Sequence, residues 1–96
     1  MQLLTDQIRE KLPNLYSQEN IEDPIAQVKF FLPNSNWTWY ATEFDGHDLF
    51  FGLVQGLEEE LGYFSLSELK SVNFHGLGVE RDLSFTPTPL SQLRQR

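Results

Sequence analysis

The 96-residue sequence contains no cysteine, a single methionine and no long apolar run. The lack of cysteine excludes disulfides, thiolate nucleophiles and cysteine-ligated zinc, and it is typical of proteins from reducing compartments, so we expect a cytoplasmic protein. No window approaches the ~18 consecutive apolar residues of a membrane-spanning helix, and the first residues lack the basic and apolar regions of a signal peptide. We therefore expect no membrane association.

Basic residues are absent from residue 30 to residue 69, a stretch that carries seven acidic residues. The whole chain has 14 acidic and seven basic residues, so this stretch accounts for the entire formal net charge of −7. Binding to a nucleic-acid backbone needs clustered lysine and arginine, so the charge argues against a nucleic-acid partner. The stretch is either a solvated surface that keeps a phenylalanine-rich domain soluble or a surface that steers a basic partner.

The length and the apolar content of 40% predict one small domain over residues 1–96. We expect an N-terminal helix and loop over 1–24, a sheet core over 25–64, and short helices with a final strand over 65–96. Strands are predicted over 25–32, 37–44, 49–54, 61–65 and 79–85, and short helices over 5–12, 66–71 and 89–95. Strands in succession indicate an α+β fold, a mostly antiparallel sheet of four to five strands with short N-terminal, middle and C-terminal helices.

Helix caps support these boundaries. Thr5 is the predicted N-cap of the first helix, and Ser65 with Glu68 has the spacing of a capping box at the start of the second. Thr88 followed by Pro89 predicts the start of the last helix, whose Leu90 and Leu93 would pack back onto the domain.

The central hairpin has a predicted register. A two-residue turn at Asp45 and Gly46 would place Glu43 opposite Asp48, and like charges in that position are destabilising, so we expect a loop over 45–48. The pairs that follow are Phe44 with Leu49, Thr42 with Phe51, Tyr40 with Leu53, and Trp39 with Val54. Regular alternation also puts Trp37 and Trp39 on the same face as Glu43.

Three runs of residues resemble a known family: W-T-W-Y-A-T-E (37–43), E-L-G-Y-F-S-L-S-E-L (60–69) and V-E-R-D-L (79–83). The chain resembles, over about residues 25 to 90, a family of short bacterial proteins catalogued as a domain of unknown function. The resemblance implies an association with plasmids and other mobile elements, and it assigns no catalytic or binding residue. Many members have a glycine-rich stretch with proline where this chain has residues 55–59, Q-G-L-E-E.

The leading hypothesis is a small protein-interaction module, without catalytic residues or a cofactor, that presents an acidic face to a protein partner. A basic partner is compatible with the charge, and tryptophans are favoured at binding hot spots. The candidate binding residues are Trp37, Trp39, Glu43, Asp45, Glu58, Glu59 and Glu60. A narrower version is mimicry of nucleic acid by Glu43 and Asp45, whose spacing along a strand approximates that of successive phosphates.

The alternative is a divalent-metal-binding protein or a metal-dependent hydrolase. Glu43, Asp45, His47 and Asp48 cluster around the predicted hairpin tip, and hard cations prefer carboxylate oxygens. The same composition is typical of a solvated turn. Single-stranded nucleic-acid binding ranks third, because stacking platforms normally lie in basic grooves. No phosphate-binding loop, nucleophile elbow or paired-histidine motif is present, and His75 has no evident catalytic partner.

Glu80, Arg81 and Asp82 form an acid-base-acid triplet in the last predicted strand. Arg81 would project away from its two neighbours, so each side chain needs a partner elsewhere. We expect ion pairs that fix the C-terminal segment to the sheet, with Glu43 or Glu68 as partner of Arg81. A site for an anionic group is the alternative.

Overall fold

The computed structural model describes residues 1–95, so residue 96 of the expected domain lies outside the described residues. The strands are β1 (Ile25–Ala26), β2 (Val28–Phe31), β3 (Thr38–Phe44), β4 (Leu49–Gln55), β5 (Glu59–Ser65), β6 (Glu80–Arg81) and β7 (Thr88–Pro89). The helices are α1 (Asp6–Lys11), α2 (Leu66–Ser71) and the 3₁₀ helix η1 (Leu90–Gln92). None of the helices in residues 1–95 combines the length and apolar character that a membrane span requires.

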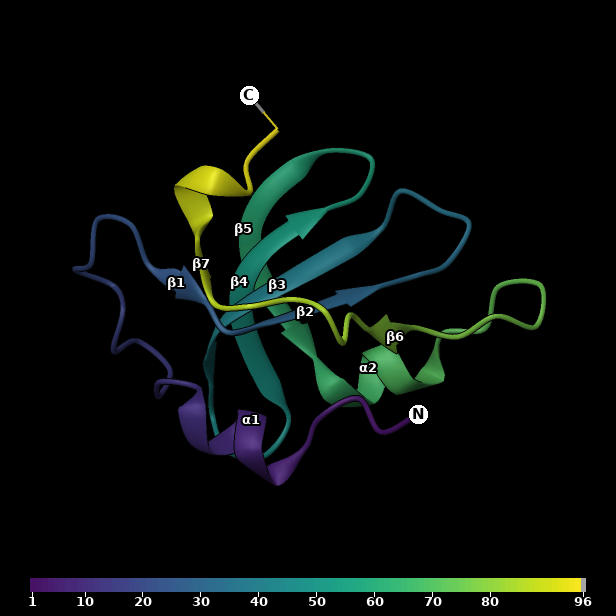
Figure 1. The fold of residues 1–96 in the computed structure, drawn as a ribbon, viewed down its shortest axis with the longest axis horizontal. Helices are drawn as coiled ribbons and strands as arrows, with labels where there is room; N and C mark the ends of the chain where they lie inside the picture. The colour runs from purple at the N-terminus through teal and green to yellow at the C-terminus, as the bar shows by residue number, and fades with distance from the viewer. Residues whose placement is uncertain (96) are drawn as a thin grey trace.

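Two antiparallel sheets confirm the predicted α+β class. Five strands form one sheet in the order β5-β4-β3-β2-β6, and β1 pairs with β7 in a small second sheet (Figure 1). The first strand predicted, 25–32, is split at Gln27, whose N–H donates to the Ala41 carbonyl at 2.9 Å before the chain continues into β2. Strand β5 begins two residues earlier than predicted, and the strand predicted over 79–85 shortens to β6.

The first two predicted helices are confirmed with their caps. The Ile8 N–H donates to Thr5 Oγ1 at 3.2 Å, and Ser65 and Glu68 form the expected capping box. The third prediction is wrong in detail, because Thr88 and Pro89 form β7 and only one 3₁₀ turn follows. The Asp23 carboxylate takes the capping role instead, accepting the Ser91 N–H at 3.0 Å.

The five-stranded sheet has two differently covered faces. Trp39, Val54 and Glu60 form one row across β3, β4 and β5, and Tyr40, Leu53 and Leu61 form the next row on the opposite face. We call the first the helix-side face, because α2 packs on it, and the second the loop-side face, because residues 13–24 and the C-terminal segment lie over it (Figure 1).

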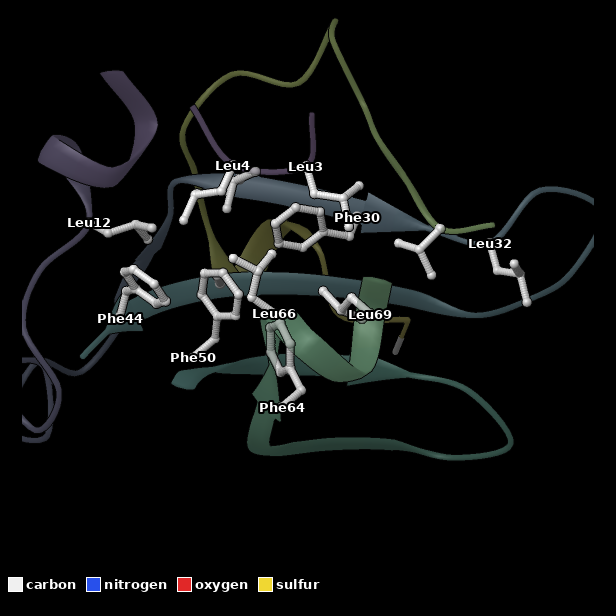
Figure 2. Packing of buried hydrophobic residues seen from close by; sticks show 13 residues of the cluster. Leu3, Leu4, Leu12, Phe30, Leu32, Phe44, Phe50, Phe64, Leu66 and Leu69 are labelled. Carbon is white, nitrogen blue, oxygen red and sulfur yellow. The ribbon is translucent and has the colours of Figure 1, made fainter. Parts of the chain in front are cut away.

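The main core lies on the helix-side face. Figure 2 shows its aromatic and aliphatic side chains converging from the sheet, α2 and the N-terminal segment: Phe30, Phe44, Phe50, Phe64, Leu66, Leu69, Leu3 and Leu4. A smaller cluster lies on the loop-side face, where Leu90 packs on Ala26, Tyr40 and Leu53. Leu93 is partly buried against this cluster. The predicted return of Leu90 and Leu93 onto the domain is therefore confirmed.

A β-bulge at Thr42 changes the central register. The predicted pairs of Tyr40 with Leu53 and Trp39 with Val54 are confirmed, and so is the loop over 45–48. Beyond Ala41 the strand shifts by one residue, so that Glu43 pairs with Phe51 and Phe44 with Phe50. The predicted pairs of Thr42 with Phe51 and Phe44 with Leu49 are wrong, because a bulge inserts one extra residue on one strand. The Thr42 hydroxyl donates to the Phe51 carbonyl at 3.1 Å.

The same bulge separates two residues that were expected to share a face. Glu43 lies on the loop-side face through its pairing with Phe51, whereas Trp39 lies on the helix-side face through Val54. The predicted common face of Trp39 and Glu43 is therefore wrong, because one extra residue reverses the side on which all later side chains of the strand point.

Candidate functional site

Glu43 is a buried carboxylate that fastens a loop to the sheet. The side chain is 4% exposed, and its two oxygens accept the N–H groups of Tyr16 at 2.9 Å and Gln18 at 2.8 Å. These bonds hold residues 13–24 against the loop-side face. Glu43 therefore contributes no exposed carboxylate to a surface.

The carboxylates at the tip of the β3–β4 hairpin hold local structure. Asp45 Oδ1 accepts the N–H groups of His47 and Asp48 at 2.8 Å and of Leu49 at 3.0 Å, and these hydrogen bonds lower the pKa of Asp45. Asp48 accepts the Ser67 N–H at 2.8 Å and its hydroxyl at 2.7 Å, at the start of α2. Within residues 1–95, no group of three or more His, Cys, Asp or Glu side chains is arranged to hold a metal ion.

The predicted binding residues divide between the two ends of the sheet. Asp45 precedes β4 and Glu58 follows it, so the length of that strand, roughly 20 Å, separates them. Glu59 Oε2 accepts the Gln55 side-chain amide at 2.7 Å and the Gln95 N–H at 2.9 Å. Trp37, Trp39 and Glu60 lie near one another. Glu43 and Asp45 lie at the other end of the sheet, near the β3–β4 hairpin tip.

A shallow groove lies beside the tryptophans on the helix-side face. The rings of Trp37 and Trp39 stack with centroids 5.8 Å apart, and Trp37 is 38% exposed. The groove has a volume of about 280 Å³ and is lined mainly by Trp39, Val54, Glu60, Gly62, Phe64 and Glu68. No basic residue lines it in the described part of the chain. We call it the helix-side groove.

A second groove, of about 290 Å³, lies on the opposite face of β5. Its apolar wall comes from Leu61 and Tyr63 of β5, from Tyr16 and Ile21 of the loop, and from Phe51, whose ring packs against Tyr63. These β5 side chains are partly open to solvent, Leu61 at 46% and Tyr63 at 53%, and Tyr16 is 60% exposed. We call this the loop-side groove.

More acidic than basic residues line the loop-side groove. Glu19 and Glu22 line it together with Arg94. Burial raises the pKa of the Tyr63 phenol, with smaller contributions from a hydrogen bond to Tyr16 and from the charges of Glu43 and Glu19. The phenol of Tyr63 is thus surrounded by groups that disfavour its ionised form.

Two residues of the acid-base-acid triplet, Arg81 and Asp82, make structural contacts, and the predicted partners of Arg81 are wrong. Arg81 donates to the backbone carbonyls of Gln2 and Leu3, the latter at 3.0 Å, and contacts neither Glu43 nor Glu68. Arg81 reaches these carbonyls because β6 lies at the sheet edge next to the N-terminal segment. Asp82 pairs with Lys29 at 3.5 Å, and Glu80 is exposed.

Sequence reasoning missed the loop-side groove. Leu61 and Tyr63 are two residues apart in a predicted strand, so their common face was accessible from the alternation. No local pattern connects these two residues with Tyr16 or Ile21, because the loop is held beside them by long-range hydrogen bonds such as those to the buried Glu43.

No curated protein and no solved structure matches this chain. A family model does match, and it covers both sheets and the helices of the described residues completely. Residues 3–95 fit the family described as "Protein of unknown function (DUF2958)", and the chain belongs to that family.

Proposed function

We propose that this protein is a protein-interaction module that binds a basic segment of another protein at the helix-side groove. The observation that carries the proposal is the position of Trp39, stacked on Trp37, beside the carboxylates of Glu60 and Glu68. Tryptophan offers a large rigid contact surface and attracts cations to its ring face. The two carboxylates complement a lysine or arginine side chain.

The charge of the chain supports a basic partner. All seven units of the formal net charge arise between residues 30 and 69, the stretch that supplies both carboxylates of the groove. A field of one sign accelerates encounter with an oppositely charged partner, and salt screens it. Binding should therefore weaken as ionic strength rises.

The test uses intrinsic fluorescence, since Trp37 and Trp39 are the only tryptophans. The protein is titrated with a capped octapeptide of alternating lysine and valine, and with one of alternating glutamate and valine. We expect a saturable change in tryptophan emission with the lysine peptide alone, and its dissociation constant should rise with added salt. Equal binding of both peptides would contradict the proposal, as would no binding of either.

Matched variants locate the interaction. Glu60→Gln and Glu68→Gln each remove one charge from the groove, and glutamine at position 68 keeps an oxygen for the capping box. Glu10→Gln removes an exposed charge on α1, outside both grooves. We expect each groove variant to weaken binding by roughly two- to fivefold and Glu10→Gln to have a smaller effect.

A further inference from the structure

Strand β5 is an unpaired edge of the five-stranded sheet. It spans seven residues, Glu59–Ser65, and pairs with β4 on one side only. Proteins commonly shield such edges with proline, inward-pointing charges or a covering element. At the middle of β5, Leu61 and Tyr63 are instead both substantially exposed.

The hydrogen bonds at the two ends of the β4–β5 pair fix the direction of its backbone groups. The Leu66 N–H donates to the Asp48 carbonyl at 2.8 Å, and the Gly56 N–H donates to the Glu58 carbonyl at 3.0 Å. In an antiparallel pair these bonds recur at every second residue, so Glu60, Gly62 and Phe64 direct their backbone groups toward β4.

Leu61 and Tyr63 consequently direct their N–H and C=O groups outward. No hydrogen bond within residues 1–95 uses these four groups. The outward N–H of Ser65 is occupied, because it donates to Glu68 Oε1 at 3.1 Å. The open part of the edge is therefore centred on Gly62.

The two grooves lie on opposite faces of this same edge. Glu60, Gly62 and Phe64 line the helix-side groove, whereas Leu61 lines the loop-side groove. Tyr63 borders both grooves, and its ring packs edge-on against Phe51 in the loop-side groove. A strand placed beside β5 would direct its side chains alternately into one groove and the other. Gly62 leaves room for a long side chain, since a methyl group built at this position meets no atom within 4 Å.

We propose that the basic partner adds an extended strand to β5, antiparallel to it, with basic side chains in the helix-side groove and apolar side chains in the loop-side groove. This inference rests on the proposed function and specifies how the same partner binds. Residues opposite Leu61 and Tyr63 form the backbone hydrogen bonds and place apolar side chains against Tyr16 and Ile21. The residue opposite Glu60 is lysine or arginine, an opposite-charge pair across neighbouring strands.

Charge distinguishes this occupant from a second copy of the chain. Two copies paired through β5 about Gly62 would place Glu60 of each opposite Phe64 of the other, so neither carboxylate would gain a cation. Each copy would also bring a formal net charge of −7. A basic strand instead places a cation opposite Glu60.

N-methylation of the lysine-valine peptide tests the backbone contacts without changing the protein. In the antiparallel arrangement the valines face β5 with their N–H groups and the lysines face solvent. Methylating the valine nitrogens should weaken binding at least tenfold, the equivalent of about one lost hydrogen bond, and methylating the lysine nitrogens should leave it nearly unchanged. The reverse pattern would assign a parallel strand and overturn the antiparallel arrangement.

A pair of protein variants tests the same backbone hydrogen bonds by changing β5 and not the peptide. Leu61→Pro removes an N–H that β4 does not use, at an edge position where proline is tolerated. Leu61→Ala removes the side chain and keeps the N–H. We expect Leu61→Pro to bind the lysine peptide at least tenfold more weakly than Leu61→Ala, with circular dichroism confirming that both are folded.

The outcomes separate the two proposals. Binding of the lysine peptide to wild type, with equal affinity for both methylated peptides, overturns strand addition and leaves the proposed function standing. Failure of wild type to bind the lysine peptide overturns the proposed function itself. Sedimentation that shows a wild-type dimer and a Leu61→Pro monomer would make a second copy the occupant, which overturns the basic strand.

Discussion

Substitution of two paired glycines should have opposite effects on stability. Gly52 lies between Ala41 and Gly62 in the middle of the sheet, and a methyl group at Gly52 would lie 1.8 Å from the Tyr40 carbonyl oxygen. The backbone of β3 would have to move by roughly 1 Å or more, and overpacking of this kind costs about 1–3 kcal/mol. At Gly62 a methyl meets nothing within 4 Å, and loss of glycine's extra freedom stabilises a strand by about 0.5–1 kcal/mol.

Urea unfolding followed by circular dichroism measures both effects. We expect the free energy of unfolding of Gly52→Ala to fall by about 2–3 kcal/mol, which lowers the melting temperature by roughly 10–20 °C in a domain of this size. Gly62→Ala is the matched control, since it makes the same chemical change one strand away. If the two variants agree within about 0.5 kcal/mol, the close approach of β3 and β4 at Gly52 is refuted.

Glu43→Gln should lower the free energy of unfolding by about 1–3 kcal/mol and accelerate amide exchange at Tyr16 and Gln18, because one charged hydrogen bond is lost; unchanged exchange would contradict this. The lowered pKa of Asp45 means that its carboxylate stabilises the fold above pH 3.8, and this contribution is lost as the pH falls through the folded-state pKa. Asp45→Asn should therefore show a smaller loss of stability below pH 3.8 than wild type in acid titrations monitored by fluorescence. Burial first, and then the hydrogen bond to Tyr16, raise the pKa of Tyr63, so Tyr16→Phe should lower it in an ultraviolet titration of the tyrosines.

Local chemistry made part of the fold predictable. The capping box of Ser65 and Glu68 depends on two residues three positions apart, and both its bonds are present. The loop over 45–48 followed from the repulsion that a tighter turn would create between Glu43 and Asp48. Such interactions lie within a few residues of one another, so they can be inferred before any tertiary contact is known.

The bulge at Thr42 could not be predicted in the same way. Residues 41–44, Ala-Thr-Glu-Phe, fit regular alternation and contain no glycine or proline to mark an irregularity. The position of Glu43 depends on the N–H groups of Tyr16 and Gln18, 27 and 25 residues away along the chain. Long-range partners decided this part of the register.

The candidate site was predictable only in part. Trp37, Trp39 and Glu60 were identified from composition, and they lie at the same end of the sheet. The role of Leu61 and Tyr63 depends on β5 being an edge strand and on the direction of its backbone groups. Both properties follow from the order of strands in space, which one sequence does not determine.

The pairing of β1 with β7 also bears on how the chain folds during synthesis. Ile25 pairs with Pro89, and the Leu90 N–H donates to the Pro24 carbonyl at 3.0 Å, so the loop-side cluster closes across more than 60 residues. Contacts this distant in sequence slow folding, because a long loop must close before they form. A nascent chain can form the β3–β4–β5 hairpins early, but Ala26 and Leu53 stay uncovered until Leu90 has left the ribosome. The segment around Leu90 therefore completes the fold, and a chain that still lacks it is the form most exposed to chaperones and proteases.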